Sequence, residues 1–133
     1  MKTSMVLCLV LLGSVVSGCE SSSDTDWLPR YAGEVNGDDG SVEGVLRRDG
    51  LCLYVEVVPS NFRWLPVFPT HRVWFSSDDN ALTIDRQQTH VGEYLFLGGS
   101  GLESAVYEDV DWARQPDESC DSTNLWFVGL FDD

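Results

Sequence analysis

Short apolar stretches, several of them alternating with polar residues, recur along the chain from Ser41 onward and are separated by turn-forming residues. This period of two is typical of β-strands that bury one face, and no stretch has the apolar spacing of an amphipathic helix. The pattern therefore predicts a domain built from strands. The expected strands cover residues 42–47, 51–58, 73–75, 81–85, 93–97 and 125–130.

Turn and breaker residues predict how these strands are joined. Asp49-Gly50 favours a type I′ hairpin, in which both central residues take positive φ. The two prolines of residues 64–69 each lack an N–H for the sheet, so this stretch is expected at an edge or a bulge. We expect a loop at residues 86–92. The glycine-rich residues 98–101 are expected to end the preceding strand, as a turn or as a bend that closes a barrel.

Five or six short strands in about a hundred residues predict an all-β fold. The arrangement resembles a small Greek-key barrel of the OB-like type, in which closure removes the strand edges that would otherwise pair with other chains. A two-sheet β-sandwich is the alternative that the same pattern allows.

The N-terminus has the parts of a secretory signal: a basic residue, Lys2, then an apolar run from Met5 to Leu12, then small residues. The apolar run falls short of the roughly 20 residues that a membrane-spanning helix needs. Val16-Ser17-Gly18-Cys19 resembles the lipobox of bacterial lipoproteins. The resemblance implies that cleavage makes Cys19 the first residue, carrying a diacylglyceryl group and often a third acyl chain such as palmitate. Ordinary secretory cleavage without acylation is the alternative.

This signal predicts a lipid-anchored protein on the extracytoplasmic side of the cell membrane or the outer membrane. We therefore divide the chain into a signal peptide (1–18), a lipidated cysteine with a flexible tether (19–30) and a β-barrel domain (31–133). Trp27 and Tyr31, next to the tether, are expected to pack back onto the barrel.

The composition limits the classes of partner that can be expected. The 115 residues from Cys19 onward suffice for one domain, and because Lys2 is the only lysine they hold 7 Arg against 22 Asp and Glu, a net charge of −15. Nucleic-acid binding depends on neutralising phosphates with Lys and Arg, so no nucleic-acid partner is expected. Basic proteins, peptides and neutral sugars remain compatible.

The cysteines predict a disulfide. Cys8 is lost with the signal and Cys19 is acylated, which leaves Cys52 and Cys120 as an even pair in an oxidising compartment. A metal pair is the rival, but no Cys or His lies at zinc-ligand spacing from either thiol.

Several segments of the domain are similar to those of a group of small uncharacterised bacterial secreted or lipid-anchored proteins. They are residues 50–53, 65–69, 91–93 and 98–101, and residues 125–129 preceded by Cys120. The resemblance spans most of the mature chain. It supports the barrel and the cysteine pair and implies no particular activity.

The candidate ligand-binding residues are Phe62, Trp64 and Trp74, because aromatic rings beside loops stack on sugars or hold apolar groups of a partner. Packing in the core is the alternative for each.

The polar motifs point to no metal or cofactor. The acidic groups Asp78-Asp79-Asn80 and Glu108, Asp109, Asp111 lack the spaced ligands of a calcium loop, and are expected in solvated loops. His71 and His90 have no companion at metal-ligand spacing, and there is no nucleophile elbow or phosphate-binding loop.

The sequence thus predicts a lipid-anchored envelope protein that is a binding or structural module rather than an enzyme, with a protein, sugar or peptide ligand. The alternative is an envelope hydrolase that uses a carboxylate pair. That activity would need a cleft with two converging acids, at least one of them with a raised pKa.

Overall fold

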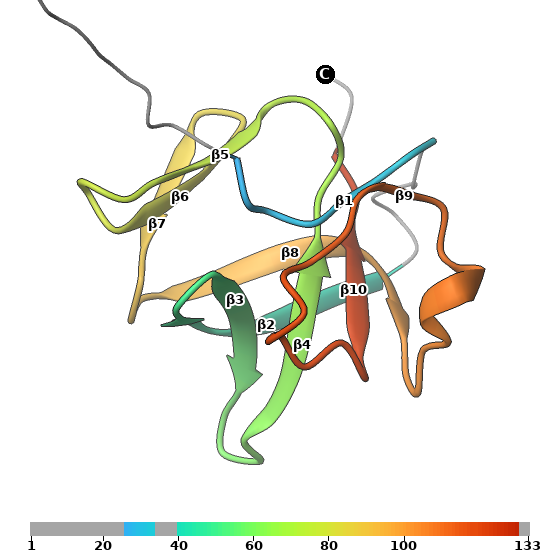
Figure 1. The fold of residues 1–133 in the computed structure, drawn as a ribbon. Coiled ribbons are helices and arrows are strands. Elements are labelled where there is room, and N and C mark those ends of the chain that lie inside the picture. Colours follow the sequence, from blue (N-terminus) through green and yellow to red (C-terminus); the bar gives the residue numbers. More distant parts are fainter. Residues whose placement is uncertain (1–25, 34–39, 131–133) are drawn as a thin grey trace, which may run out of the picture.

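The computed structural model describes residues 26–33 and 40–130 and confirms the predicted all-β barrel (Figure 1). Five strands close the barrel in the order β10-β4-β3-β2-β8. They are β2 (Gly40–Asp49), β3 (Cys52–Val57), β4 (Phe62–Val67), β8 (Tyr94–Leu102) and β10 (Leu125–Val128). Neighbouring strands are antiparallel except β4 and β10, which are parallel. This closed Greek-key order matches the predicted OB-like type and excludes the two-sheet sandwich.

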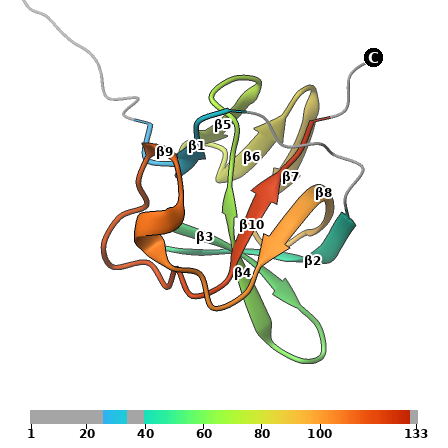
Figure 2. The same ribbon diagram turned by 90° about the vertical axis from the view of Figure 1, so that its right-hand side faces the viewer.

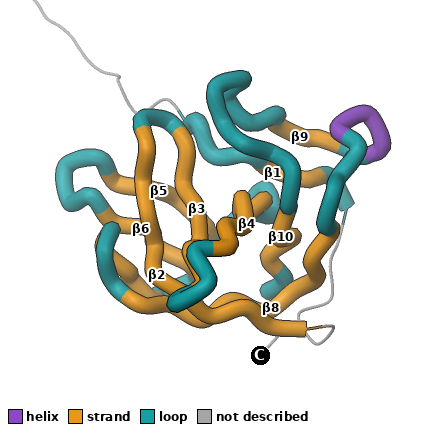
Figure 3. The backbone as a smooth tube through the Cα atoms, turned by 90° about the horizontal axis from the view of Figure 1, so that it is seen from below, coloured by secondary structure: helices purple, strands orange, loops and turns teal. Residues whose placement is uncertain are grey.

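Two small sheets flank the barrel (Figures 1 and 3). The first is the antiparallel sheet of β5 (Val73–Ser76), β6 (Ala81–Ile84) and β7 (Gln87–His90), inserted between β4 and β8. The second pairs β1 (Arg30–Tyr31) with β9 (Trp112–Arg114). The prediction of a loop at residues 86–92 was wrong. Residues 87–90 form β7, which sequence patterning does not reveal because its side chains mostly face solvent and show no apolar alternation.

The glycines of residues 98–101 do not end a strand as predicted. They lie inside β8, which pairs with β2 along its first part and with β10 along its second. Gly99 is the position where the two pairings meet, and it is opposite both Gly40 and Val128. A Cβ on Gly99 would lie 1.9 Å from the Phe127 carbonyl oxygen, and its φ is +137°. The glycines therefore form the predicted barrel-closing bend.

The prolines of residues 64–69 predicted an edge strand, but β4 has a neighbouring strand on each side in the barrel, β3 and β10. Its first half, residues 62–64, pairs with β3, and its second half, residues 65–67, pairs with β10. Pro66 lies in the second half, beyond the pairing with β3. The missing N–H is tolerated because this part of the strand is paired on one side.

The β2–β3 hairpin turns one residue later than predicted. Asp49 pairs with Cys52, so the two central residues are Gly50 and Leu51. Gly50 has a φ of +61°, while Leu51 is not among the residues with positive φ. Glycine at the first central position is the requirement of a type II′ turn rather than the type I′ turn expected.

The barrel strands bury both faces over part of the sheet. The interior holds one apolar cluster, which includes Leu46, Val55, Leu97 and Trp126. A second cluster lies on the outer face of β3, β4 and β10. Its buried members are Tyr31, Cys52, Tyr54, Leu65, Val67 and Leu125.

The β8–β10 connection, residues 103–124, covers this outer face (Figure 2). It contains the short 3-10 helix Tyr107–Asp109 and β9, and it packs Ala105, Val110 and Trp112 against the second cluster. The predicted disulfide fastens it, since the Sγ atoms of Cys52 on β3 and Cys120 are 2.09 Å apart.

The segment before β1 closes one end of the barrel. Leu28, 1% exposed, joins the interior cluster, and the Arg30 guanidinium donates to the carbonyls of Pro69 and Val73 at 2.6 and 2.8 Å. Tyr31 donates to the Val128 carbonyl at 2.7 Å. Residues 27–30, which we had placed in the tether, thus belong to the folded domain.

Candidate functional site

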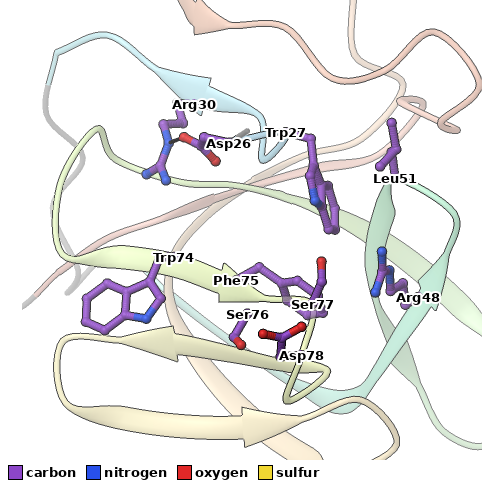
Figure 4. Close-up of a pocket in the computed structure, with 10 residues that line it drawn as sticks. All are labelled: Asp26, Trp27, Arg30, Arg48, Leu51, Trp74, Phe75, Ser76, Ser77 and Asp78. Atoms are coloured by element: carbon purple, nitrogen blue, oxygen red, sulfur yellow. Dashed lines mark hydrogen bonds and ion pairs between the residues drawn. The ribbon is translucent and has the colours of Figure 1, made fainter. Parts of the chain in front are cut away.

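A groove of about 920 Å³ runs between the segment before β1 and strand β5 (Figure 4). Its size falls within the range of small-molecule and peptide pockets, about 300–1,000 Å³. The lining residues are Asp26, Trp27, Arg30, Arg48, Leu51, Trp74, Phe75, Ser76, Ser77 and Asp78. They come from four stretches of chain: residues 26–30, the β2–β3 hairpin from Arg48 to Leu51, β5 and the turn after β5.

One end of the groove is a stack of two aromatic rings and a guanidinium. The ring centroids of Trp27 and Phe75 are 5.2 Å apart, and the Arg48 Cζ lies 5.2 Å from the first and 4.9 Å from the second. Arg48 also donates to the Gly50 carbonyl at 2.9 Å. These contacts hold the guanidinium against both rings through cation–π attraction, which keeps this wall of the groove in place.

Ion pairs fix the opposite wall. Asp26 accepts from Arg30 Nε at 2.5 Å, and Arg114 Nε lies 3.8 Å from the same carboxylate oxygen. Burial alone would raise the pKa of Asp26, but the hydrogen bonds from Arg30 and the Leu28 N–H, with the charges of Arg30 and Arg114, lower it below its ordinary value. Asp26 is therefore a structural anion whose oxygens are already in use.

Trp74 is the aromatic residue of the groove that is most available to a ligand. Its exposed fraction is 53%, and Figure 4 shows its ring at the end of the groove away from Trp27 and Arg48. An exposed indole next to a hollow offers a large apolar surface and one N–H donor. The Ser76 and Ser77 side chains and the Asp78 carboxylate add polar groups along β5 and its turn.

The three predicted ligand-binding residues do not lie together. Trp74 lines the groove, whereas Phe62 and Trp64 are on β4, where their ring centroids are 5.2 Å apart. The Trp64 ring centroid also lies 5.4 Å from that of Trp126, and the ring packs against the interior cluster. For Trp64 the structure therefore shows core packing, the alternative kept open above.

The sequence reasoning missed Arg48 and Arg30 as groove residues. Neither arginine is part of a recognisable motif, because the contacts that place them in the groove, to the Pro69 and Val73 carbonyls and to the Trp27 and Phe75 rings, join distant parts of the chain. Trp27 was expected to pack back onto the domain, and its ring does so against Phe75.

The face that OB-type barrels use for oligonucleotides and oligosaccharides is occupied in this protein. That face lies on the second and third barrel strands, which are β3 and β4 here. Their outer side chains form the second cluster and lie under residues 103–124, with Cys120 bonded to Cys52. Residues 103–124 therefore cover the part of β3 and β4 that carries this cluster.

The acidic groups make no metal site within the described part of the chain, where no three Asp, Glu, His or Cys side chains gather. Asp78 lines the groove, while Asp109 and Asp111 line a smaller hollow of about 260 Å³ beside Tyr31. His90 Nδ1 is 3.3 Å from the Glu93 carboxylate.

The described carboxyl groups with a shifted pKa are Asp26, Glu93, Asp117 and Asp121, and each is lowered. Hydrogen bonds from nearby side chains and N–H groups cause this direction in all four. A catalytic acid in a carboxylate pair would need a raised pKa, so no shifted group in residues 26–33 and 40–130 supports the hydrolase alternative.

Within the described residues, no helix has the length and hydrophobicity needed to cross a bilayer. The lipobox residues and Cys19 lie outside the described residues. No protein-family model, curated protein or solved structure matches the chain, so the resemblances drawn from the sequence remain predictions.

Proposed function

We propose that this chain is a lipid-anchored envelope protein that binds a partner in the groove beside β5. The groove carries the proposal, because it combines an exposed indole, a fixed aromatic wall and a few polar groups in one hollow of about 920 Å³. This combination is typical of binding sites in which apolar contact gives affinity and a few polar groups give orientation.

Trp74 provides the second argument, since the fold depends on other groove residues, such as Trp27, Phe75 and Arg30, but little on this ring. The interior cluster already closes the barrel, and Trp74 contributes little to it because 53% of its surface is exposed. An exposed aromatic at the rim of a hollow is the arrangement expected of a contact residue.

The anchor would keep the groove near the membrane. Six residues lie between Cys19 and Asp26, the first residue of the groove, and the seven Cα-to-Cα steps of an extended chain span about 25 Å at most. With acyl chains on Cys19, a partner bound in the groove would lie close to the bilayer surface. A partner in or next to the same membrane is therefore favoured.

Site-specific photocrosslinking in the native envelope tests the binding site. Benzoylphenylalanine in place of Trp74 should give a discrete crosslinked product, and the same group in place of Phe96 is the matched control. Phe96 is similarly exposed, at 59%, but lies on β8 and does not line the groove. Equal products from both positions, or none from position 74, would contradict a partner in the groove.

Intact-mass analysis of the protein from its native membrane tests the anchor. We expect a mature chain that begins at Cys19 with the added mass of two or three acyl chains. The Cys19→Ser variant should lose this mass, because serine has no thiol to carry the acyl chains. An unacylated wild-type chain would refute the proposal.

A further inference from the structure

Among the described strands, β5 is at the edge of its sheet, and its free edge faces the groove. It pairs with β6 on one side, and its other side faces the segment that carries Asp26 and Arg30 (Figure 4). Free edges present unpaired N–H and C=O groups, and a neighbouring chain can pair with them.

The register of the sheet identifies the groups on that edge. Asp85 N–H donates to the Arg72 carbonyl at 2.7 Å, so the hydrogen bonds to β6 alternate from residue 72 to residues 74 and 76. Val73 and Phe75 therefore direct their N–H and C=O groups away from β6. The Arg30 guanidinium confirms this direction, since it reaches the Val73 carbonyl at 2.8 Å.

Phe75 is thus the residue whose backbone is available to a ligand. Within the described part of the chain, no side chain or loop group bonds to its N–H or its C=O outside the sheet. Both groups lie on the stretch of β5 that lines the hollow, between the exposed ring of Trp74 and the hydroxyl of Ser76.

We propose that the partner in the groove is an extended peptide segment with basic residues, which adds to the free edge of β5 as a further strand. This inference rests on the proposed function and names the class of its partner. Backbone hydrogen bonds to Phe75 would hold the segment. Its alternate side chains would lie beside Trp74 on one face and beside Phe75 and Trp27 on the other.

Charge favours a basic segment. Both arginines of the groove are engaged: Arg30 by Asp26 and two carbonyls, Arg48 by two rings and the Gly50 carbonyl. Asp78, in contrast, lines the groove with no ion pair among the described residues. The mature chain carries a net charge of −15, a field that attracts cations and speeds their association. The same charge repels a second copy of this chain.

The test selects peptides that bind the groove and then asks which of their backbone N–H groups are needed for binding. Random nonapeptides are selected on the purified protein and counter-selected on the Trp74→Ala variant. One selected peptide is synthesised unmodified and in two forms, each N-methylated at alternate residues. Strand addition predicts that one methylated form loses at least about tenfold in affinity while the other binds nearly as well, because only alternate N–H groups face β5.

Amide hydrogen exchange gives an independent readout. In the free protein the Phe75 amide should exchange faster than the Trp74 amide, which the register assigns to β6. The unmodified peptide should slow the Phe75 amide at least about tenfold and leave the Trp74 amide unchanged. Tolerance of both methylated forms, or an unchanged Phe75 amide with bound peptide, would overturn strand addition.

The outcomes separate this inference from the proposed function. Failure to select basic peptides, together with a crosslinked non-peptide partner at position 74, would overturn the peptide and keep the binding site. A crosslinked second copy of the chain would overturn the basic partner. Absence of any product at position 74 would overturn the binding site itself.

Discussion

Removal of the Cys52–Cys120 disulfide should cost this domain a large part of its stability. The bond closes a loop of 68 residues. The loss of chain entropy in the unfolded state on closing a loop of this length corresponds to about 4 kcal/mol at 25 °C. A small domain has about 5–15 kcal/mol in total, so the bond supplies a substantial share.

The native state should largely survive the change. The connection over β3 and β4 keeps other contacts to these strands, including the Asp121 N–H to the Tyr54 hydroxyl at 2.9 Å and the Leu65 N–H to the Asn124 carbonyl at 2.8 Å. The Cys52→Ala, Cys120→Ala double variant should therefore fold to the same barrel. Its melting temperature should be lower by roughly 15–25 °C.

Thermal melting followed by circular dichroism measures this change. Wild-type protein in dithiothreitol should melt at the temperature of the double variant, and the reductant should have no effect on the variant itself. A double variant that melts within about 3 °C of oxidised wild type would refute the entropy argument. It would also show that residues 103–124 need no fastening.

Three further predictions concern the bend, the ion pair and the segment before β1. Gly99→Ala should destabilise the domain by at least about 3 kcal/mol in urea denaturation, because its Cβ would lie 1.9 Å from the Phe127 carbonyl oxygen. Gly92→Ala is the control: its φ is +97° but its Cβ would meet open space, so it should cost only about 1–2 kcal/mol. Asp26→Asn should destabilise the domain at neutral pH, and the difference in unfolding free energy from wild type should shrink as pH falls below 3.8. The reason is that the lowered pKa of Asp26 in the native state gives stability that is lost when the carboxylate is protonated; an equal difference at all pH values would contradict the ion pair. Tyr31→Phe should cost about 1–2 kcal/mol in the same denaturation assay by leaving the buried Val128 carbonyl without this donor, and an unchanged midpoint would show that the bond contributes nothing.

The sequence predicted the barrel through two local signals: alternating burial, as in β2 and the first part of β8, and short apolar runs between turn residues, as in β3. The strand predicted at residues 93–97 and the β2–β3 hairpin follow directly from these signals. β7 was missed because Gln87–His90 is polar on both faces, so its pairing with β6 comes from the neighbouring strand rather than from its own pattern. The bend at Gly99 could be predicted as a closure, but the sequence alone did not show that one strand runs through it.

The candidate site was predictable only in its aromatic part. Trp74 was identified because an aromatic next to a polar turn is a contact residue by type. The groove also depends on Arg48, which stacks on rings from two other parts of the chain, and on the burial of Arg30 beneath β5. These placements are set by tertiary packing between the insert and the N-terminal segment, which leaves no trace in local spacing.

The central claim, that a partner binds beside β5 and not on the covered face of β3 and β4, is tested most directly by NMR chemical-shift mapping. A selected peptide is added to the ¹⁵N-labelled protein. We predict that the largest shifts fall on residues 73–77 and on the indole N–H signals of Trp27 and Trp74. Shifts centred instead on Tyr54 and its neighbours under residues 103–124 would contradict the account.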